Sequence, residues 1–181
     1  MNRQDTLIKM ILSALFLALA YVMPFLTGQI PEIGSMLCPL HIPVILCGFI
    51  CGWKYGLVIG LIAPLFRSLT LGMPPIFPTA TSMSFELAAY GAISGVMYNI
   101  LPKKKLYIYC SLLTAMIIGR IIWGIAMFIC MGIKNSPFTF NAFIAGAFVN
   151  ALPGIILQII VIPVIIMTLE KINILKTEKK A

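Results

Sequence analysis

The chain has 181 residues, of which 61% are hydrophobic and only 10% charged, with a mean hydropathy of +1.06 and a formal net charge of +8. A soluble domain typically carries about 25% charged residues, so this chain has too little polar surface to cover a globule in water. The composition therefore excludes a soluble protein and predicts an all-α integral membrane protein, with residues 1–181 as a single domain.

Glycine, proline and charged residues divide the apolar sequence into six predicted transmembrane helices, which we expect to pack as one compact bundle. In chain order these helices cover residues 6–24, 40–52, 55–71, 80–100, 106–131 and 141–170. A loop with Gly28, Pro31 and Gly34 follows the first helix, and the sequence LGMPPIFP ends the third, because proline lacks the N–H that a helix needs. The first apolar run has no small-residue cleavage site, so we expect a retained helix and no signal peptide.

The basic residues predict the orientation in the membrane. With six helices both termini lie on one side, and that side carries ten lysines and arginines, whereas the other carries Lys134 opposite Glu32. The ten are Arg3, Lys9, Lys54, Lys103, Lys104, Lys105, Lys171, Lys176, Lys179 and Lys180. Because basic loops stay inside, both termini are predicted to be cytoplasmic. The net charge is thus a topology signal and indicates no nucleic-acid binding. A re-entrant hairpin in place of the second and third helices would displace only Lys54.

Three ions lie in otherwise apolar ground and are predicted in the outer half of the bundle or near its middle: Arg67, Glu86 and Arg120. An arginine at bilayer depth costs about 2.5–3.5 kcal/mol on insertion scales. Glu86 can neutralise only one of the two arginines, so these three residues carry one surplus positive charge. A buried cation without a partner is unfavourable, which predicts an anionic ligand. The two parallel N–H groups of a guanidinium suit a carboxylate or a phosphate. A channel or a proton relay needs polar groups along its whole length, whereas this distribution favours a pocket that opens outward.

Other candidate substrate-binding residues have structural alternatives. Tyr90 shares a helical face with Glu86 but is also typical of core packing, and Trp123 could line a pocket or belong to the interfacial aromatic belt. Asn150 is predicted two to three turns inside the sixth helix. Arg67 could instead reach the outer headgroups, with Glu86 as a purely structural partner.

Enzyme chemistry is not expected. The single histidine, His41, is more typical of a helix start or an interface than of a ligand, and it excludes paired-histidine haem sites. The five cysteines form no CxxC pair, there is no nucleotide-binding GxxxxGK[ST] motif, and no convincing catalytic set is visible. We therefore expect no metal, no cofactor and no use of ATP by this chain.

The six short helices, the cytoplasmic termini, the Ala14-x3-Ala18 spacing and the outward polar pocket together resemble the substrate-binding S components of the energy-coupling-factor (ECF) vitamin transporters. The segment Leu37–Ala80 is similar to members from Gram-positive bacteria. The resemblance implies a multi-pass protein of the plasma membrane that captures a vitamin or vitamin precursor from outside. The loops Phe25–Pro39 and Leu71–Thr79 would close over the substrate.

The resemblance also implies partners. The first helix would dock through Ala14 and Ala18 on a transmembrane coupling subunit, and two ATPase subunits would hydrolyse the ATP. Pantothenate suits the predicted positive pocket best, while folate, biotin, lipoate and a flavin remain open. Two other classes also remain: a self-sufficient small permease or channel for an organic anion, and a membrane scaffold without a ligand.

Overall fold

The computed structural model describes residues 3–27, 36–102 and 104–172, and the regular structure within these ranges is entirely helical. Several residues used above lie outside the described residues: Gly28, Pro31, Glu32, Gly34, Lys103, Lys176, Lys179 and Lys180. The same holds for most of the predicted loop Phe25–Pro39, of which residues 28–35 are not described.

The described helices follow the predicted order, with boundaries that differ by a few residues. They are α1 (Arg3–Val22), the 3-10 turn η1 (Met23–Thr27), α3 (His41–Cys51), α4 (Trp53–Leu71), the wide π-type turn η2 (Ile76–Ala80), α5 (Thr81–Ile100), α6 (Lys105–Ile133), α7 (Phe140–Ile144), the wide turn η3 (Ala145–Val149) and α8 (Leu152–Lys171). Each of the six predicted helices thus has a counterpart in the structure, although the last one is divided.

The predicted sixth helix, residues 141–170, was wrong in one respect: it is not continuous. The chain passes from α7 through η3 into a turn at Asn150 and Ala151, and α8 begins at Leu152. Pro153 stands at the second position of α8, where its missing N–H is harmless, whereas an unbroken helix would force its ring against the carbonyl four residues earlier. The break therefore moves Asn150 out of the helix interior to an exposed position.

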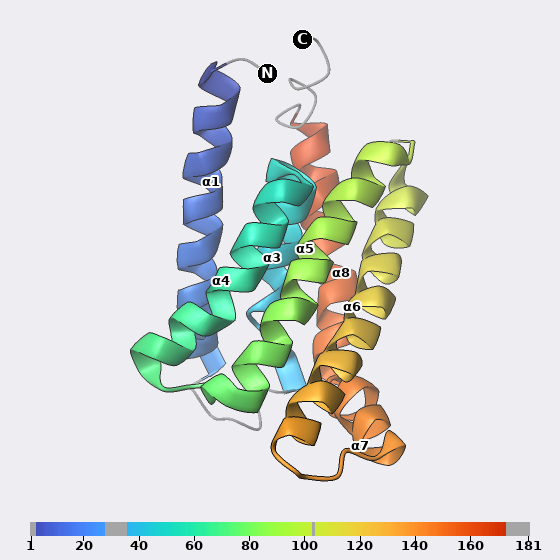
Figure 1. Cartoon of the computed structure of the whole chain (residues 1–181). Helices are drawn as coiled ribbons and strands as arrows, with labels where there is room; N and C mark the ends of the chain where they lie inside the picture. The colour runs from blue at the N-terminus through green and yellow to red at the C-terminus, as the bar shows by residue number, and fades with distance from the viewer. Residues whose placement is uncertain (1–2, 28–35, 103, 173–181) are drawn as a thin grey trace.

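The helices stand side by side in an elongated bundle (Figure 1), with α1 beginning and α8 ending at the same end. We call this the terminal end; η1, η2 and α7 lie at the opposite end, the loop end. Four described segments are long and apolar enough to cross a membrane: Arg3–Phe25, Trp53–Leu71, Lys105–Ile133 and Phe140–Lys171. The helices fit a multi-pass membrane protein, and the cytoplasmic location of the terminal end stays a prediction.

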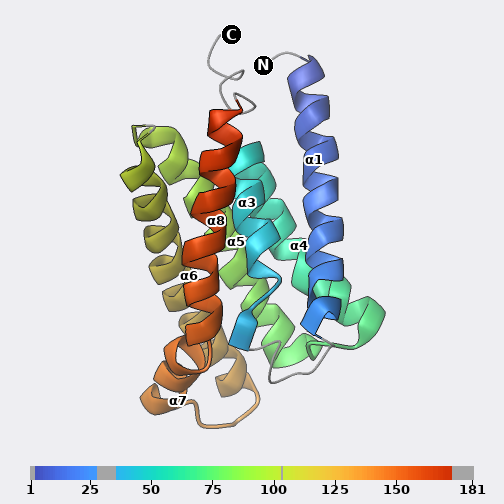
Figure 2. The same ribbon diagram turned by 180° about the vertical axis from the view of Figure 1, so that it is seen from behind.

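Helix α3 lies at the centre of the bundle and is too short to cross a membrane alone. Its 11 residues span about 16 Å at 1.5 Å per residue. All of them except Ile50 are buried, and α3 packs against α1, α4, α5 and α8; Figure 2 shows it enclosed by these helices. Because other helices surround α3, its backbone is shielded from lipid although it is too short to cross a membrane alone.

Glycines let α4 and α5 approach at backbone contact. A methyl group added to Gly91 of α5 would collide with the carbonyl of Gly56 in α4, and one added to Gly95 would lie 2.5 Å from the backbone nitrogen of Trp53. Gly48 of α3 meets Gly91 in the same way. Small residues at such interfaces allow close packing where lipid supplies no hydrophobic driving force. Gly91 and Gly95 therefore serve the close packing of α5 against its neighbours.

The terminal half of the bundle is mainly aliphatic core around α3, with buried side chains such as Ile45, Leu112 and Ile166. One polar contact interrupts it near the terminal end: the Tyr98 hydroxyl of α5 donates a hydrogen bond to Glu170 Oε1 of α8 at 2.5 Å. This contact ties α5 to α8 where both approach their ends.

The close contact between α4 and α5 generates a stability prediction. Gly91→Ala should lower the free energy of unfolding by about 1–3 kcal/mol or more, because the new methyl group must push two backbones apart. The measurement is the thermal unfolding midpoint of the detergent-purified protein.

Gly132→Ala is the matched control, since an added methyl group there meets nothing within 4 Å and alanine favours the helix. Its midpoint should be unchanged or slightly higher. An equal loss of stability in both variants would contradict the assigned packing role of Gly91.

Candidate functional site

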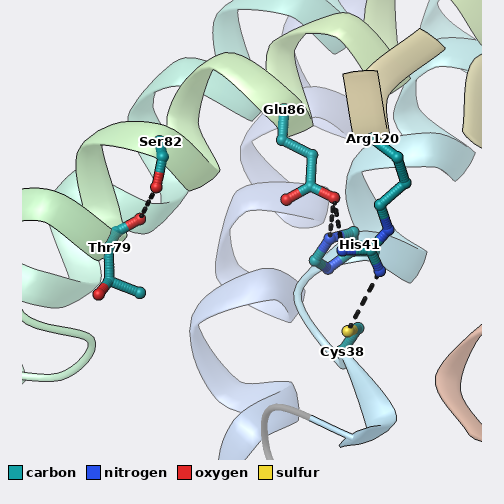
Figure 3. Close-up of polar contacts among 6 residues, drawn as sticks. All are labelled: Cys38, His41, Thr79, Ser82, Glu86 and Arg120. Atoms are coloured by element: carbon teal, nitrogen blue, oxygen red, sulfur yellow. Dashed lines mark hydrogen bonds and ion pairs between the residues drawn. The ribbon is translucent and has the colours of Figure 1, made fainter. Parts of the chain in front are cut away.

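A buried ion pair joins α5 to α6 and forms the centre of the candidate site. Arg120 Nη1 lies 3.0 Å from Glu86 Oε1, and both side chains are almost fully buried. Figure 3 shows the two side chains directed toward each other from neighbouring helices. Opposite charges at this distance attract strongly where water is excluded. Of the two arginines considered for Glu86, Arg120 is thus its partner.

The segment before α3 brings two more side chains to this pair. His41, the first residue of α3, places Nε2 at 3.5 Å from the same Glu86 oxygen, and Arg120 Nη2 donates toward the Cys38 sulfur at 3.8 Å (Figure 3). Cys38 has a φ of 47°, and its carbonyl accepts a hydrogen bond from the His41 N–H. This left-handed turn brings Cys38 to Arg120 and His41 to Glu86.

The Cys38 side chain faces Arg120 as a neutral thiol. Burial raises the pKa of the Cys38 thiol, although the nearby guanidinium acts in the opposite direction. A thiol sulfur is a weak acceptor, so Cys38 leaves most of the hydrogen-bonding capacity of Arg120 Nη2 unused.

Tyr90 completes the group on the α5 side. It lies one turn from Glu86, is fully buried, and its ring centroid is 5.3 Å from that of His41. Gly119 of α6 makes room for the ring, since a methyl group there would collide with the Tyr90 ring carbons. We call Cys38, His41, Glu86, Tyr90 and Arg120 the polar cluster.

The polar cluster retains unused hydrogen-bonding groups. Among the described residues, His41 Nδ1 and Arg120 Nε are buried and have no hydrogen-bond partner. Leaving a buried polar group unsatisfied costs about 1–3 kcal/mol. Buried groups of this kind are typical of sites that serve a ligand and not the stability of the fold alone.

Arg67 lies elsewhere and does not pair with Glu86. Its Nη1 donates to the Tyr21 carbonyl at 3.1 Å, and its guanidinium lies 5.6 Å from the centre of the Phe25 ring. Tyr21 is in the last turn of α1, where carbonyls lack helical partners and the helix dipole favours a cation. The three predicted ions therefore do not form a single set with one surplus charge.

Trp123 and Asn150 also lie apart from the polar cluster. The Trp123 ring packs against Phe138 and Phe143, with centroids 6.2 Å apart in each case, and it is half-buried. Asn150 is exposed in the break before α8. Substrate binding by Arg67, Trp123 and Asn150 stays a prediction from the sequence, whereas Glu86, Tyr90 and Arg120 are brought together.

Sequence reasoning did not assign Cys38 and His41 to the site. The only histidine of the chain, in an apolar stretch, was a usable signal, because a buried imidazole needs polar partners. For Cys38 no comparable signal exists, since its contact with Arg120 depends on a turn that the sequence does not reveal.

A second feature lies on the outer face of α1. Ala14 and Ala18 are exposed and line an open, apolar groove of about 310 Å³. Leu17, Tyr21 and Val22 of α1 and Phe66 of α4 form the rest of its lining. Because alanine side chains are small, this face offers a shallow surface against which another helix can pack closely.

Comparison with known proteins agrees with this picture. The family model described as the ECF transporter, substrate-specific component, matches residues 8–166. No curated protein and no solved structure matches the chain. Members of this family bind a small-molecule substrate in the membrane and interact with an energy-coupling module made of a transmembrane unit and ATPase units. Because the match spans most of its length, the chain belongs to the family of ECF transporter substrate-specific components, which are membrane transport proteins and not enzymes.

Proposed function

We propose that this chain captures a small acidic vitamin or vitamin precursor of the pantothenate type and delivers it by docking through α1 on an energy-coupling module. The partner ATPase subunits, and not this chain, would use the ATP. The main support is the polar cluster, in which buried charges and unpartnered polar atoms occur together. His41 begins α3 and Glu86 lies in the second turn of α5, so the cluster is nearer the loop end. With the termini in the cytoplasm, this end would face outward.

Arg120 is the residue best suited to recognise an acid. Its Nη1 is engaged by Glu86, its Nη2 reaches only toward a thiol sulfur, and its Nε has no partner among the described residues. The edge formed by Nε and Nη2 therefore holds donors that the described residues leave largely unused. A carboxylate can accept two parallel hydrogen bonds from such an edge, which gives both affinity and orientation.

The preference for an acid no longer depends on a surplus charge. Arg120 and Glu86 balance each other, and Arg67 is held separately at the end of α1. The geometry of the Arg120 guanidinium edge favours an acid instead. The nearby Tyr90 ring and the apolar residues around α3 would exclude water and strengthen that interaction.

Neutralising the ion pair tests this assignment. The double variant Glu86→Gln/Arg120→Gln should weaken pantothenate binding about 10- to 100-fold, because it removes charge-assisted hydrogen bonds to the carboxylate. Both residues are changed together since either charge alone would be buried without a partner, at a cost of about 3–5 kcal/mol. Isothermal titration of the purified protein measures the effect.

Arg67→Gln is the matched control, because it removes a buried guanidinium that contacts α1 and not the polar cluster. It should lower stability more than it lowers affinity. Loss of binding in Arg67→Gln, with normal binding in the double variant, would place the substrate at Arg67 instead.

The groove on α1 supports the docking part of the proposal. Ala14 and Ala18 are four residues apart, face outward and line the same groove, so their spacing is not used for packing inside the bundle. A membrane-embedded groove lined by apolar and small side chains suits one apolar helix of the coupling subunit. The groove is on the side of α1, away from Glu86 and Arg120, so ligand and partner would use different surfaces.

Filling the groove should separate docking from binding. Ala14→Leu/Ala18→Leu should abolish ATP-dependent uptake by the assembled transporter, because the added side chains prevent close approach of a partner helix. Ligand affinity of the isolated chain should not change. Uptake into proteoliposomes and co-purification with the coupling subunit are the measurements.

Leu15→Phe is the control, since Leu15 is exposed on α1 but does not line the groove. It should assemble and transport normally. Normal uptake by the double leucine variant would exclude this docking face, and uptake by the chain reconstituted alone would favour a self-sufficient permease.

A further inference from the structure

Gln158 of α8 is a deeply buried polar side chain outside the polar cluster. It is 1% exposed, and neither its Nε2 nor its Oε1 has a hydrogen-bond partner among the described residues. A carboxamide offers two donors and an acceptor, so its burial without partners is costly for the fold. Aliphatic residues occupy the neighbouring buried positions of this stripe, Ile162 and Ile166.

The packing of α8 places Gln158 beside the start of α3. Gly154 lies one turn earlier on the same face of α8, and a methyl group added there would come within 2.6 Å of the Met36 carbonyl and 2.7 Å of the Leu37 carbonyl. These carbonyls directly precede Cys38 of the polar cluster. Helices α3 and α8 pack against each other and both run from the loop end toward the terminal end (Figure 2). Gln158 lies one turn after Gly154 toward the terminal end, which places it level with the first turn of α3, where His41 lies.

We infer that Gln158 is a substrate-recognition residue that hydrogen-bonds an uncharged donor–acceptor group of the ligand, such as an amide, a urea or a hydroxyl group. This inference rests on the proposed function, in which Arg120 binds the acidic end. It narrows the substrate class to a small organic acid that also carries such a neutral group. The Gln158 carboxamide lacks hydrogen-bond partners among the described residues. A ligand that hydrogen-bonds both of its polar atoms would supply those partners.

If Gln158 has this role, its replacement should change ligand affinity and protein stability in opposite directions. Replacement of Gln158 by an apolar residue of similar size removes two unsatisfied buried atoms, so the ligand-free protein should become more stable. The same replacement removes a contact to the ligand, so affinity should fall. A glutamine that served only to hold the fold together would show a loss of stability instead.

The experiment compares wild type, Gln158→Met and the control Leu157→Met, a neighbouring exposed position of α8. Pantothenate and biotin serve as acids with an amide or urea group, and lipoate serves as an acid without one. Titration calorimetry measures each affinity, and thermal unfolding without ligand measures stability. In wild type we expect binding of pantothenate or biotin with preference over lipoate.

In Gln158→Met the affinity for the preferred acid should fall about tenfold or more, lipoate binding should change little, and the unfolding midpoint should rise. Leu157→Met should match wild type in all three. An unchanged affinity, a lowered midpoint or a wild-type preference for lipoate would each overturn the role of Gln158 while leaving the proposed capture of an acid intact. A wild type that binds none of the three acids would contradict the proposed function itself.

Discussion

The arrangement of the bundle around its polar cluster depends on the burial of Glu86 and Arg120 as a pair. Either charge alone at this depth would be strongly unfavourable, whereas together they satisfy much of each other's electrostatic requirement. The pair fixes how α5 and α6 lie relative to each other, and the contacts of His41 and Cys38 add the start of α3 to the same point. Glycines make this approach possible: Gly119 accommodates Tyr90 beside Arg120, and Gly91 lets α4 lie directly on the other side of α5.

The two buried arginines are stabilised in different ways. Arg120 has a carboxylate, whereas Arg67 uses a carbonyl in the last turn of α1 and the face of an aromatic ring. Arg67 therefore closes the end of a helix and joins α4 to α1. Arg67 binds the carbonyl of Tyr21, and Tyr21 also lines the groove beside Ala14 and Ala18. Phe66, which precedes Arg67 in the chain, lines the same groove. A structural arginine thus supports the face that is proposed to meet the coupling subunit.

Aliphatic and polar buried side chains lie in different halves of the bundle. Aliphatic side chains dominate the terminal half, and the polar cluster lies nearer the loop end, where the turn at Cys38 begins α3. The short α3 makes this possible, because its first turn, with His41, is buried inside the bundle. In the proposed function the polar cluster binds the ligand and the α1 groove meets the coupling subunit, so the two surfaces would not interfere with each other.

Composition and spacing alone determined the membrane class and the order of the six helices, and they singled out Arg67, Glu86 and Arg120 as isolated charges in apolar helices. These follow from local physics: a bilayer requires long apolar helices, and proline and glycine interrupt them. Isolated charges in such helices are costly and need a partner. Tertiary structure decided which arginine pairs with Glu86, that Cys38 and His41 join them, and that Arg67, Trp123 and Asn150 lie apart. It also decided that the last helix breaks before Pro153. These outcomes depend on how helices distant in sequence rotate and tilt against one another, and the rotation of an almost uniformly apolar helix leaves little trace in its hydrophobic pattern.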